Sequence, residues 1–259
     1  GRGAIDETYD NYIGMIGSYG NRCANMGVAN ADLLIALGTR LDTRQTGARL
    51  DQFLSNGHII HVDIDDNELE YHRLLNRKKV NCTIDCFLQK EKEMPVSLGD
   101  ISEWNFFLHG LKQRYGQDEE IERFVENKSP YRFMQYFDSL TQTDDVISAD
   151  IAQNQMCAAQ TLRLKSGQKF VTSGGLAPMG FSLPVAIGCS FANPNKKVFS
   201  INGDGGFHMA IQSLMLISQY NLPIKVMVLN NASLGMITQF QHLYFGDRMC
   251  GTTFGGGYR

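Results

Sequence analysis

The sequence lacks the features that mark several classes of protein. No uninterrupted apolar run approaches the roughly 20 residues that a membrane-spanning helix needs. The first residues lack the charged and then apolar layout of a signal peptide. Lys and Arg number 24 against 27 Asp and Glu, so we expect no basic surface for nucleic acid and none for an anionic membrane. We therefore expect a cytoplasmic protein whose partners are small molecules and other protein chains.

Cysteine is sparse and scattered, and no CxxC pair occurs. A chain of 259 residues that is 43% apolar can bury a sizeable core without disulfides, so reduced thiols are expected. His72, Cys82 and Cys86 are close enough in sequence to suggest zinc, but a fourth ligand at suitable spacing is missing, which favours ordinary thiols. The cysteines are Cys23, Cys82, Cys86, Cys157, Cys189 and Cys250.

Short apolar segments alternate with helix-like ones along the chain. Residues 31–38 and 58–64 are strand-like runs followed by Gly, Asp or Asn, and a second alternation starts at residue 130. The stretch between them is looser, with an amphipathic segment and an acidic run. The pattern predicts an α/β fold with two doubly wound parallel-sheet domains, 1–92 and 130–259, joined by an interdomain linker at 93–129.

Polar residues directly follow two predicted strands of the second domain. KVFSIN runs into Gly203–Gly206, and IKVMVL runs into Asn230 and Asn231. Open α/β sheets bind ligands at such strand ends, where carboxylate and amide oxygens suit Mg²⁺ and glycine amides suit a diphosphate. Gly-Asp-Gly alone would more often be a turn. The 24 residues between Gly205 and Asn230, filled by one helix and one strand, instead fit the thiamine diphosphate signature, GDG followed by NN.

The stretch 203–241 resembles the acetolactate synthase large subunit, a thiamine diphosphate-dependent family, along its whole length. The resemblance implies that Asp204, the side chain of Asn231 and the backbone carbonyl of Ser233 hold Mg²⁺. Upstream, DIAQNQMCAAQ resembles the family's phosphate-contacting segment, in which position 154 is usually His; an Asn amide can still donate a hydrogen bond. The implied cofactor-binding residues are Gln153, Asn154, Ala177, Met179, Gly203, Asp204, Gly205, Gly206, Asn231, Ser233, Gly235 and Met236.

Met179 has a special place in this resemblance. SGGLAPMGFSLPVAIG is similar to SGGLGTMGYGLPAAIG of the family, which implies that Met179 is the catalytic wedge beneath a bent cofactor. Methionine before a glycine and a helix is by itself more often core packing, but the spacing of 25 residues to Asp204 also fits the family. The bent shape brings the aminopyrimidine nitrogen to the thiazolium C2 proton. Ala177 replaces the usual Gly, and a contact made by its backbone carbonyl would survive that change.

The first segment resembles the middle domain of the same enzymes, whose pattern there is GARFDDR followed by TG. In that domain these residues contact FAD, and guanidinium groups suit its pyrophosphate. Many relatives with this domain have no flavin, and Arg40 with Asp42 could form an ordinary surface ion pair, so both readings stay open. The residues implied for FAD are Gly38, Arg40, Asp42, Arg44 and Asp63.

The resemblance implies decarboxylation of a 2-oxo acid, pyruvate in acetolactate synthase, and carboligation of the product to a second carbonyl compound. Phe240 stands where these enzymes usually have a Trp that shapes the acceptor site, so the acceptor is open. Two alternatives remain. One is a related thiamine enzyme, such as a 2-oxo acid decarboxylase or another carboligase, and the other is a non-catalytic cofactor-binding module.

The catalytic glutamate of this family lies in an N-terminal domain that nothing in the sequence matches. Gly1–Ala4 resembles a turn that normally follows a strand, and TTFGGGYR stops short of the family's usual C-terminal segment. We therefore expect an internal part of a longer enzyme that is inactive alone. We also expect a homo-oligomer, a dimer at least, in which the missing domain completes the active site.

Overall fold

The computed structural model describes residues 1–74, 77–95 and 97–254 of the chain. Contacts divide the chain into two compact units. Unit 1 contains Gly1 and Asp10–Phe124, and unit 2 contains Arg2–Tyr9 and Val125–Arg259. The last five residues of the predicted C-terminal domain, 255–259, lie outside the described residues.

Unit 1 contains a parallel sheet with the strand order β1-β2-β3 in the described residues. The strands are β1 (Leu33–Leu37), β2 (His58–Asp63) and β3 (Lys78–Asn81). The helices are α1 (Arg22–Asn30), α2 (Thr43–Thr46), the 3-10 helix η1 (Leu50–Gln52), α3 (Asp66–Glu70), α4 (Ile84–Glu93), α5 (Ser102–Tyr115) and α6 (Gln117–Phe124). The strands predicted at 31–38 and 58–64 are confirmed, whereas β3 was not expected.

Helices α5 and α6 occupy much of the segment 93–129, which the sequence predicts to be a linker. Each buries one apolar side chain, Leu111 in α5 and Ile121 in α6. Helix α5 packs against α1, and Arg22 of α1 forms an ion pair with Glu120 of α6 at 3.0 Å. The segment therefore belongs to unit 1 up to the end of α6.

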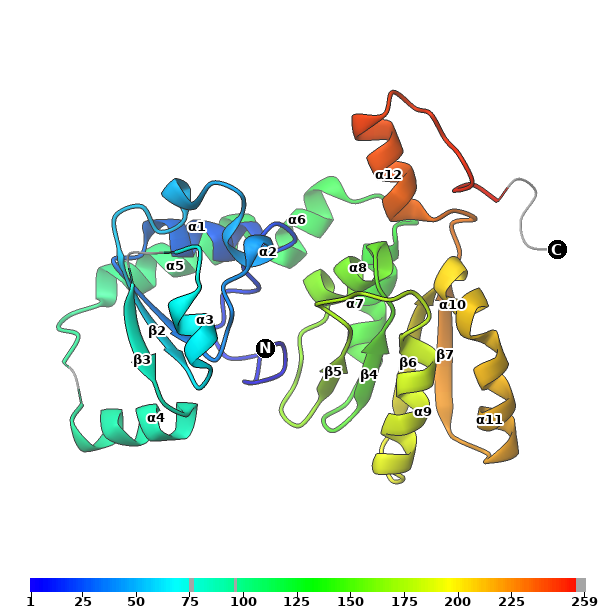
Figure 1. The fold of residues 1–259 in the computed structure, drawn as a ribbon, viewed down its shortest axis with the longest axis horizontal. Coiled ribbons are helices and arrows are strands. Elements are labelled where there is room, and N and C mark those ends of the chain that lie inside the picture. The colour runs from blue at the N-terminus through cyan, green and yellow to red at the C-terminus, as the bar shows by residue number, and fades with distance from the viewer. Residues whose placement is uncertain (75–76, 96, 255–259) are drawn as a thin grey trace. The chain divides into compact units, whose positions relative to one another are not determined.

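Unit 2 contains a parallel sheet with the strand order β5-β4-β6-β7 (Figure 1). The strands are β4 (Val146–Ala149), β5 (Lys169–Val171), β6 (Val198–Gly203) and β7 (Ile224–Leu229). The helices are α7 (Pro130–Leu140), α8 (Gln153–Thr161), α9 (Ser182–Ala192), α10 (Asp204–Ala210), the 3-10 helix η2 (Ile211–Ser213), α11 (Leu214–Gln219) and α12 (Gly235–Tyr244).

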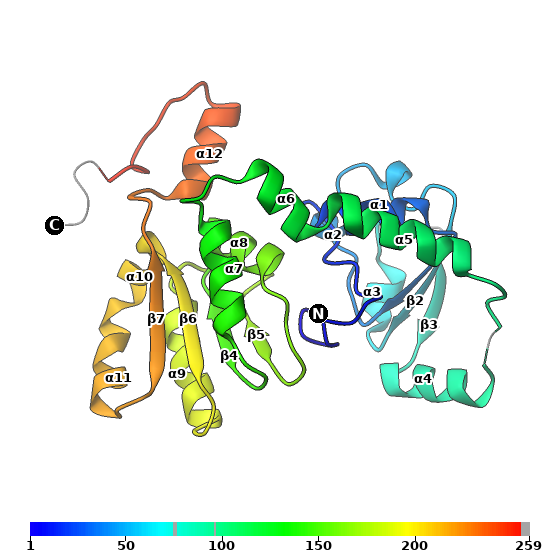
Figure 2. The ribbon, with the colours of Figure 1, turned by 180° about the vertical axis from the view of Figure 1, so that it is seen from behind.

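Helices cover both faces of the sheet in unit 2. Figure 1 shows α9 in front of the sheet, and Figure 2, seen from behind, shows α7 on the other face. Residues of β4 alternate between these faces: Ile147 and Ala149 join Met134 and Phe137 of α7 in one core, and Val146 joins the core under α9. This arrangement confirms the predicted parallel α/β fold, because strands covered on both faces are apolar nearly throughout.

The face toward α9 also contains buried hydroxyl groups. The Ser182 hydroxyl of α9 lies 2.8 Å from that of Ser148 in β4 and 2.9 Å from that of Ser200 in β6. All three side chains are fully buried. Because serine is small and its hydroxyl finds a partner here, α9 can approach the two central strands closely without leaving unsatisfied polar groups.

One helix differs from its prediction. The sequence predicts one helix between Gly205 and the next strand, but the structure has α10, η2 and α11 in succession. Helix α10 already begins at Asp204, and Ala210, with φ −118° and ψ 11°, leaves the α-helical region and ends it. The result is a short helix directly behind Gly203, with the chain bent before α11.

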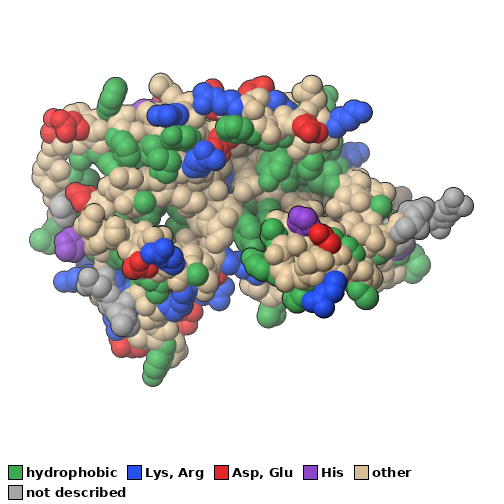
Figure 3. Space-filling view, turned by 90° about the horizontal axis from the view of Figure 1, so that it is seen from above, with side chains coloured by type: hydrophobic (Ala, Val, Ile, Leu, Met, Phe, Trp, Pro, Cys, Tyr) green, Lys and Arg blue, Asp and Glu red, His purple; other side chains and the backbone are tan. Residues whose placement is uncertain are grey.

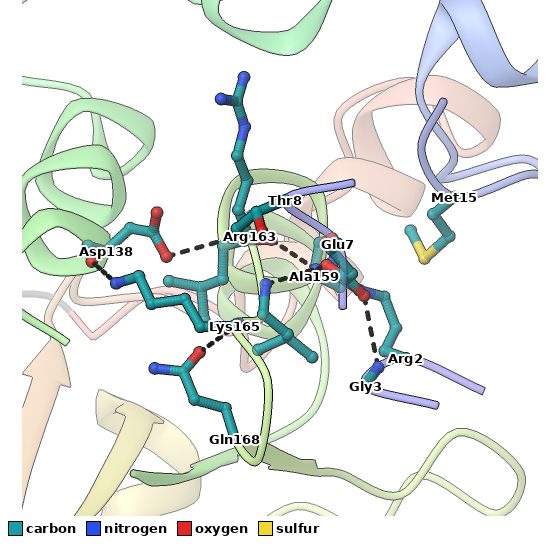
Figure 4. Close-up of polar contacts among 12 residues, drawn as sticks. Arg2, Gly3, Glu7, Thr8, Met15, Asp138, Ala159, Arg163, Lys165 and Gln168 are labelled. Carbon is teal, nitrogen blue, oxygen red and sulfur yellow. Dashed lines mark hydrogen bonds and ion pairs between the residues drawn. The ribbon is translucent and has the colours of Figure 1, made fainter. Parts of the chain in front are cut away.

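The segment Arg2–Tyr9, which we call the N-terminal clip, packs on unit 2 (Figure 4). The guanidinium group of Arg2 pairs with the Glu7 carboxylate and donates to the carbonyl oxygens of Ala159 and Leu162 at the end of α8. Glu7 is 4% exposed, and its carboxylate accepts the backbone N–H of Leu164 at 3.1 Å. The Arg2 guanidinium thus satisfies carbonyl oxygens that the end of a helix leaves without a hydrogen-bond donor.

Across the described residues, no helix combines the length and the apolar character needed to cross a membrane. On the face drawn in Figure 3, acidic and basic side chains are interspersed and neither sign forms a continuous field. This mixture agrees with the small formal net charge of −3.

Candidate functional site

The ends of three neighbouring strands define the candidate site in unit 2. Strands β5 and β6 lie on opposite sides of β4, so the chain order reverses between β4 and β6. Residue Gly203, the last of β6, pairs with Leu229, the last of β7, which brings Asp204 level with Asn230. Asp150, directly after β4, donates its backbone N–H to the carbonyl of Ile201 at 2.8 Å. Open α/β sheets bind ligands at such a switch point.

Asp204 is the one acidic residue that the sequence assigns to this site, and it is buried. The residue is 5% exposed, and its Oδ1 accepts the backbone N–H of Gly205 at 3.0 Å. Its Oδ2 is buried and has no hydrogen-bond partner among the described residues. A buried carboxylate oxygen without a partner is costly, and a divalent cation is the kind of ligand that removes this cost. The carboxylate therefore fits a Mg²⁺ site.

The turn after β7 places the two asparagines. The side-chain oxygen of Asn230 accepts the N–H of Ala232 at 2.9 Å, and that of Asn231 accepts the N–H of Ser233 at 3.1 Å. The Ser233 hydroxyl lies 2.7 Å from that of Thr238 and donates to the carbonyl of Thr252 at 3.0 Å. An amide oxygen has a second lone pair, so Asn231 keeps acceptor capacity for a cation.

The N-termini of α8 and α12 meet at Gly235. A Cβ at this position would overlap the side-chain oxygen of Gln153 and lie 2.7 Å from the side-chain nitrogen of Asn231. Gln153 is exposed and reaches the side chain of Gln239 at 3.4 Å. Met236 follows in α12 and is half-buried. The structure thus brings Gln153, Asn231 and Gly235 into one group, although they lie far apart in the sequence.

Met179 lies against the start of α10, directly after β6. A Cβ at Gly205 would be 3.1 Å from the terminal methyl carbon of Met179 and 2.7 Å from Cδ2 of Leu234. The backbone turns left-handed on both sides of the methionine, with φ 50° at Ala177 and φ 84° at Gly180. A methionine in this place borders Gly205, which agrees with the wedge position but does not test the role.

Asn154 is placed differently from an open ligand of a diphosphate. It is 8% exposed, and its amide nitrogen donates to the carbonyls of Asp150 at 2.9 Å and Ile201 at 3.5 Å. Its side-chain oxygen would lie 3.4 Å from a Cβ at Gly203. The side chain therefore ties α8 to β4 and β6, and its contact with a diphosphate stays a prediction.

The sequence does not indicate two features of the site. Asp150 is 2% exposed and accepts the backbone N–H groups of Gly180 and Phe181. Ala152 and Ala232 have φ 72° and 52°, which is a strained region for residues with a side chain. Such strain gathers at functional sites, but an alanine in a sequence gives no signal of it.

The residues implied for FAD lie at the strand ends of unit 1. Gly38 follows β1 with φ 55°, and Asp63 ends β2. The Asp42 carboxylate caps α2 by accepting the N–H groups of Arg44 at 2.9 Å and Gln45 at 3.1 Å. Asp42 therefore stabilises the N-terminus of α2.

Two histidines support the loop that contains Arg40, whose side chain, like that of Arg44, is exposed. His72 Nε2 lies 2.6 Å from the carbonyl oxygen of Arg40, and the Nε2 of the fully buried His61 lies 2.8 Å from that of Thr39. Burial lowers the pKa of His61, and Arg77 donates to its Nδ1 at 3.1 Å.

No cluster of three or more His, Cys, Asp and Glu side chains suited to a metal occurs among the described residues.

Comparison with known proteins matches both parts of the chain to one enzyme family. Residues 150–257 match the thiamine pyrophosphate enzyme C-terminal TPP binding domain, and residues 1–86 match the thiamine pyrophosphate enzyme central domain. The first of these ranges contains the strand ends described above.

Curated relatives match nearly the whole chain. A probable acetolactate synthase large subunit of Methanococcus aeolicus is 34% identical over 269 residues, covering 99% of this chain and 45% of that protein. The acetolactate synthase isozyme 2 large subunit of Escherichia coli is 35% identical over 260 residues, covering 98% and 45%. Acetolactate synthase 2, chloroplastic, of Brassica napus is 38% identical over 238 residues, covering 90% and 37%.

The chain thus spans less than half the length of each of these relatives. The two domain matches follow each other in the order central and then C-terminal, and the relatives extend the similarity through the segment 87–149 between them. The chain therefore belongs to the thiamine pyrophosphate enzymes, with a central domain and a C-terminal TPP-binding domain similar to those of acetolactate synthase large subunits.

Proposed function

We propose that this chain binds the diphosphate end of thiamine diphosphate through Mg²⁺ in an enzyme of the acetolactate synthase type. The single observation that carries the proposal is the Asp204 carboxylate, which is 5% exposed at the strand switch point and has a buried oxygen without a hydrogen-bond partner among the described residues. The chemistry of this group favours a hard cation between the protein and a phosphate.

The ligand set for Mg²⁺ is Asp204, the side-chain oxygen of Asn231 and the backbone carbonyl of Ser233. Asp204 and Asn230 are level at the ends of β6 and β7, and the following turn contains the other two groups. The remaining contacts with the cofactor are assigned to Gln153, Asn154, Ala177, Met179, Gly203, Gly205, Gly206, Gly235 and Met236.

Thiamine diphosphate, when bound, supplies the electron sink for decarboxylation of a 2-oxo acid, and we propose pyruvate as this substrate. The residues of the chain bind and orient. The side chain of Met179 borders Gly205 and would support the bound cofactor, and glycines at positions 205 and 206 would let backbone amides approach the diphosphate. We further propose a homo-oligomer, at least a dimer, whose second subunit contributes to the same site.

The proposal also includes a flavin site in unit 1. The exposed guanidinium groups of Arg40 and Arg44 follow β1, and Asp63 lies at the adjacent end of β2. These residue types fit a pyrophosphate and a ribose. The purified full-length protein should then show the absorbance of a bound flavin, and Arg40→Ala should remove it. A colourless wild-type protein that gains no flavin absorbance with added FAD would contradict the flavin site.

A decarboxylase or another carboligase is the second candidate, and Phe240 favours it. Its side chain on α12 is 45% exposed and lies beside Tyr244, with ring centroids 5.5 Å apart. A phenylalanine in place of tryptophan changes the shape of a surface next to the site. Product analysis separates the candidates, because acetaldehyde without acetolactate excludes carboligation between two pyruvate molecules.

The deciding experiment uses the full-length protein with pyruvate, thiamine diphosphate and Mg²⁺. Asp204→Ala should weaken cofactor binding by at least about tenfold in calorimetry and abolish product formation. Asp85→Ala, which removes an exposed carboxylate in unit 1, is the control and should change neither. Unchanged affinity and turnover in Asp204→Ala would refute the metal assignment, and cofactor binding without turnover of any 2-oxo acid would favour a non-catalytic binding module.

A further inference from the structure

We infer that Asp150 is a positioning residue that fixes the Met179 loop against the start of α10, directly after β6. The inference rests on the function proposed above, since Met179 matters to the reaction only if the cofactor binds there. Asp150 is neither in the GDG and NN signature nor among the residues assigned to the cofactor.

The Asp150 carboxylate joins two loops directly. It follows β4 and is 2% exposed. Its Oδ2 accepts the backbone N–H of Gly180 at 3.1 Å, and its Oδ1 accepts that of Phe181 at 3.0 Å. These are the first two amides after Met179, so both oxygens of one carboxylate hold the chain where the wedge ends and α9 begins.

The same carboxylate borders Gly206 in the first turn of α10. A Cβ at Gly206 would overlap Oδ2 of Asp150 and lie 3.3 Å from the backbone nitrogen of Gly180. A Cβ at Gly180 would in turn lie 3.4 Å from the carbonyl oxygen of Gly206. The Met179 loop and the start of α10 therefore approach each other closely beside the Asp150 carboxylate, and the Cβ atoms of Met209 and Ala210 also border Gly180.

The charge of Asp150 identifies its role. A carboxylate has the wrong sign to bind a diphosphate, and its two oxygens are already used by amides, unlike the free oxygen of Asp204. Both oxygens of a carboxylate accept hydrogen bonds, so Asp150 can hold two amides at once. These hydrogen bonds are charge-assisted and therefore roughly twice as strong as neutral ones. An asparagine would turn its NH₂ group toward one of the two amides and lose that bond.

The chain contains a matched control on the same strand. Asp145 precedes β4 as Asp150 follows it, is 4% exposed, and accepts the backbone N–H of Gln142 at 2.7 Å. It lies at the amino end of β4, away from the cofactor. Asp145→Asn therefore removes a buried, amide-bound charge of the same kind without reaching the Met179 loop.

The test compares Asp150→Asn with Asp145→Asn in the full-length protein with thiamine diphosphate and Mg²⁺. In Asp150→Asn, kcat should fall between about tenfold and a hundredfold, with KM for pyruvate within about twofold, because a misplaced wedge disturbs the reacting geometry. Exchange of the cofactor's C2 proton with deuterium should slow in parallel. Asp145→Asn should keep wild-type values for all three even if it unfolds at a lower temperature.

A measurement without cofactor keeps the inference separate from the proposed function. Backbone amide hydrogen exchange over residues 176–183 should become faster in Asp150→Asn and stay unchanged in Asp145→Asn. If the wild-type protein binds no thiamine diphosphate, the proposed function fails, and with it the role of Asp150 toward a cofactor. Unchanged loop exchange in Asp150→Asn, or equal changes in both variants, would overturn the positioning role itself.

Discussion

Removing the carboxylate of Glu7 should destabilise unit 2 far more than its place near the start of the chain suggests. In Glu7→Ala, the Arg2 guanidinium remains at the end of α8, where its side chain is 14% exposed, and the Leu164 amide loses its acceptor. Breaking a buried ion pair from one side costs about 3–5 kcal/mol. Arg2 keeps the carbonyls of Ala159 and Leu162, so we expect about 3 kcal/mol, at the lower end of this range.

Thermal unfolding followed by circular dichroism measures this loss. At about 2–4 °C per kcal/mol for a domain of this size, the midpoint of unit 2 should fall by roughly 6–12 °C. Asp6→Asn is the control: the Asp6 carboxylate accepts the N–H and the hydroxyl of Thr8 and contacts the backbone of Ser166, so its loss should lower the midpoint far less than Glu7→Ala does.

A double-mutant cycle tests the ion pair itself. The double variant Arg2→Met, Glu7→Leu should lose less stability than the sum of the two single variants, because neither charge is left without its partner. A midpoint shift below about 2 °C in Glu7→Ala, or additive losses in the cycle, would refute the reasoning, since a pair buried as described cannot be that weak.

Three further predictions concern the pH dependence of stability, the reactivity of a buried thiol, and Gly206. Burial lowers the pKa of His61, so the unfolded chain binds more protons; stability should be complete above the ordinary pKa of about 6.5 and fall as pH drops below it. Urea titrations at several pH values should show this slope flattened in His61→Asn, and parallel curves would contradict it. Burial raises the pKa of Cys157 to about 12, so iodoacetamide should modify this thiol only after unfolding, while labelling of the native protein there would contradict its burial. Gly206→Ala should cost about 1–3 kcal/mol because its Cβ overlaps Asp150, whereas Gly188→Ala in α9, with open space, should not; equal midpoints for the two variants would refute the close approach.

The sequence predicts the central elements of the candidate site because its signals are local. Each polar group directly follows an apolar strand, and parallel strands bring their ends to one edge of the sheet, so Asp204 and Asn230 had to lie near each other. The same reasoning could have singled out Asp150 in the stretch DVISAD. It did not, because one acidic residue after a strand is common in turns, and its partners Gly180 and Phe181 are about thirty residues away.

Contacts over long sequence separations explain the other differences. The docking of α5 and α6 on unit 1 depends on pairs such as Arg22 with Glu120. Asn154 looked like an open phosphate ligand in the sequence, whereas its amide nitrogen is engaged by backbone carbonyls of β4's end and of β6. Composition and periodicity predict which faces are buried, but they do not indicate which partner covers them.

The N-terminal clip has a consequence for the order in which the chain can fold during synthesis. Arg2 and Ala159 are separated by 157 positions in the sequence. At about 5–20 residues per second, the clip leaves the ribosome roughly 8–30 s before its binding site at the end of α8 exists. Unit 1, apart from Gly1, is a continuous stretch and can form in that interval, so the clip has to wait for the end of α8 although it was made before Asp10–Phe124.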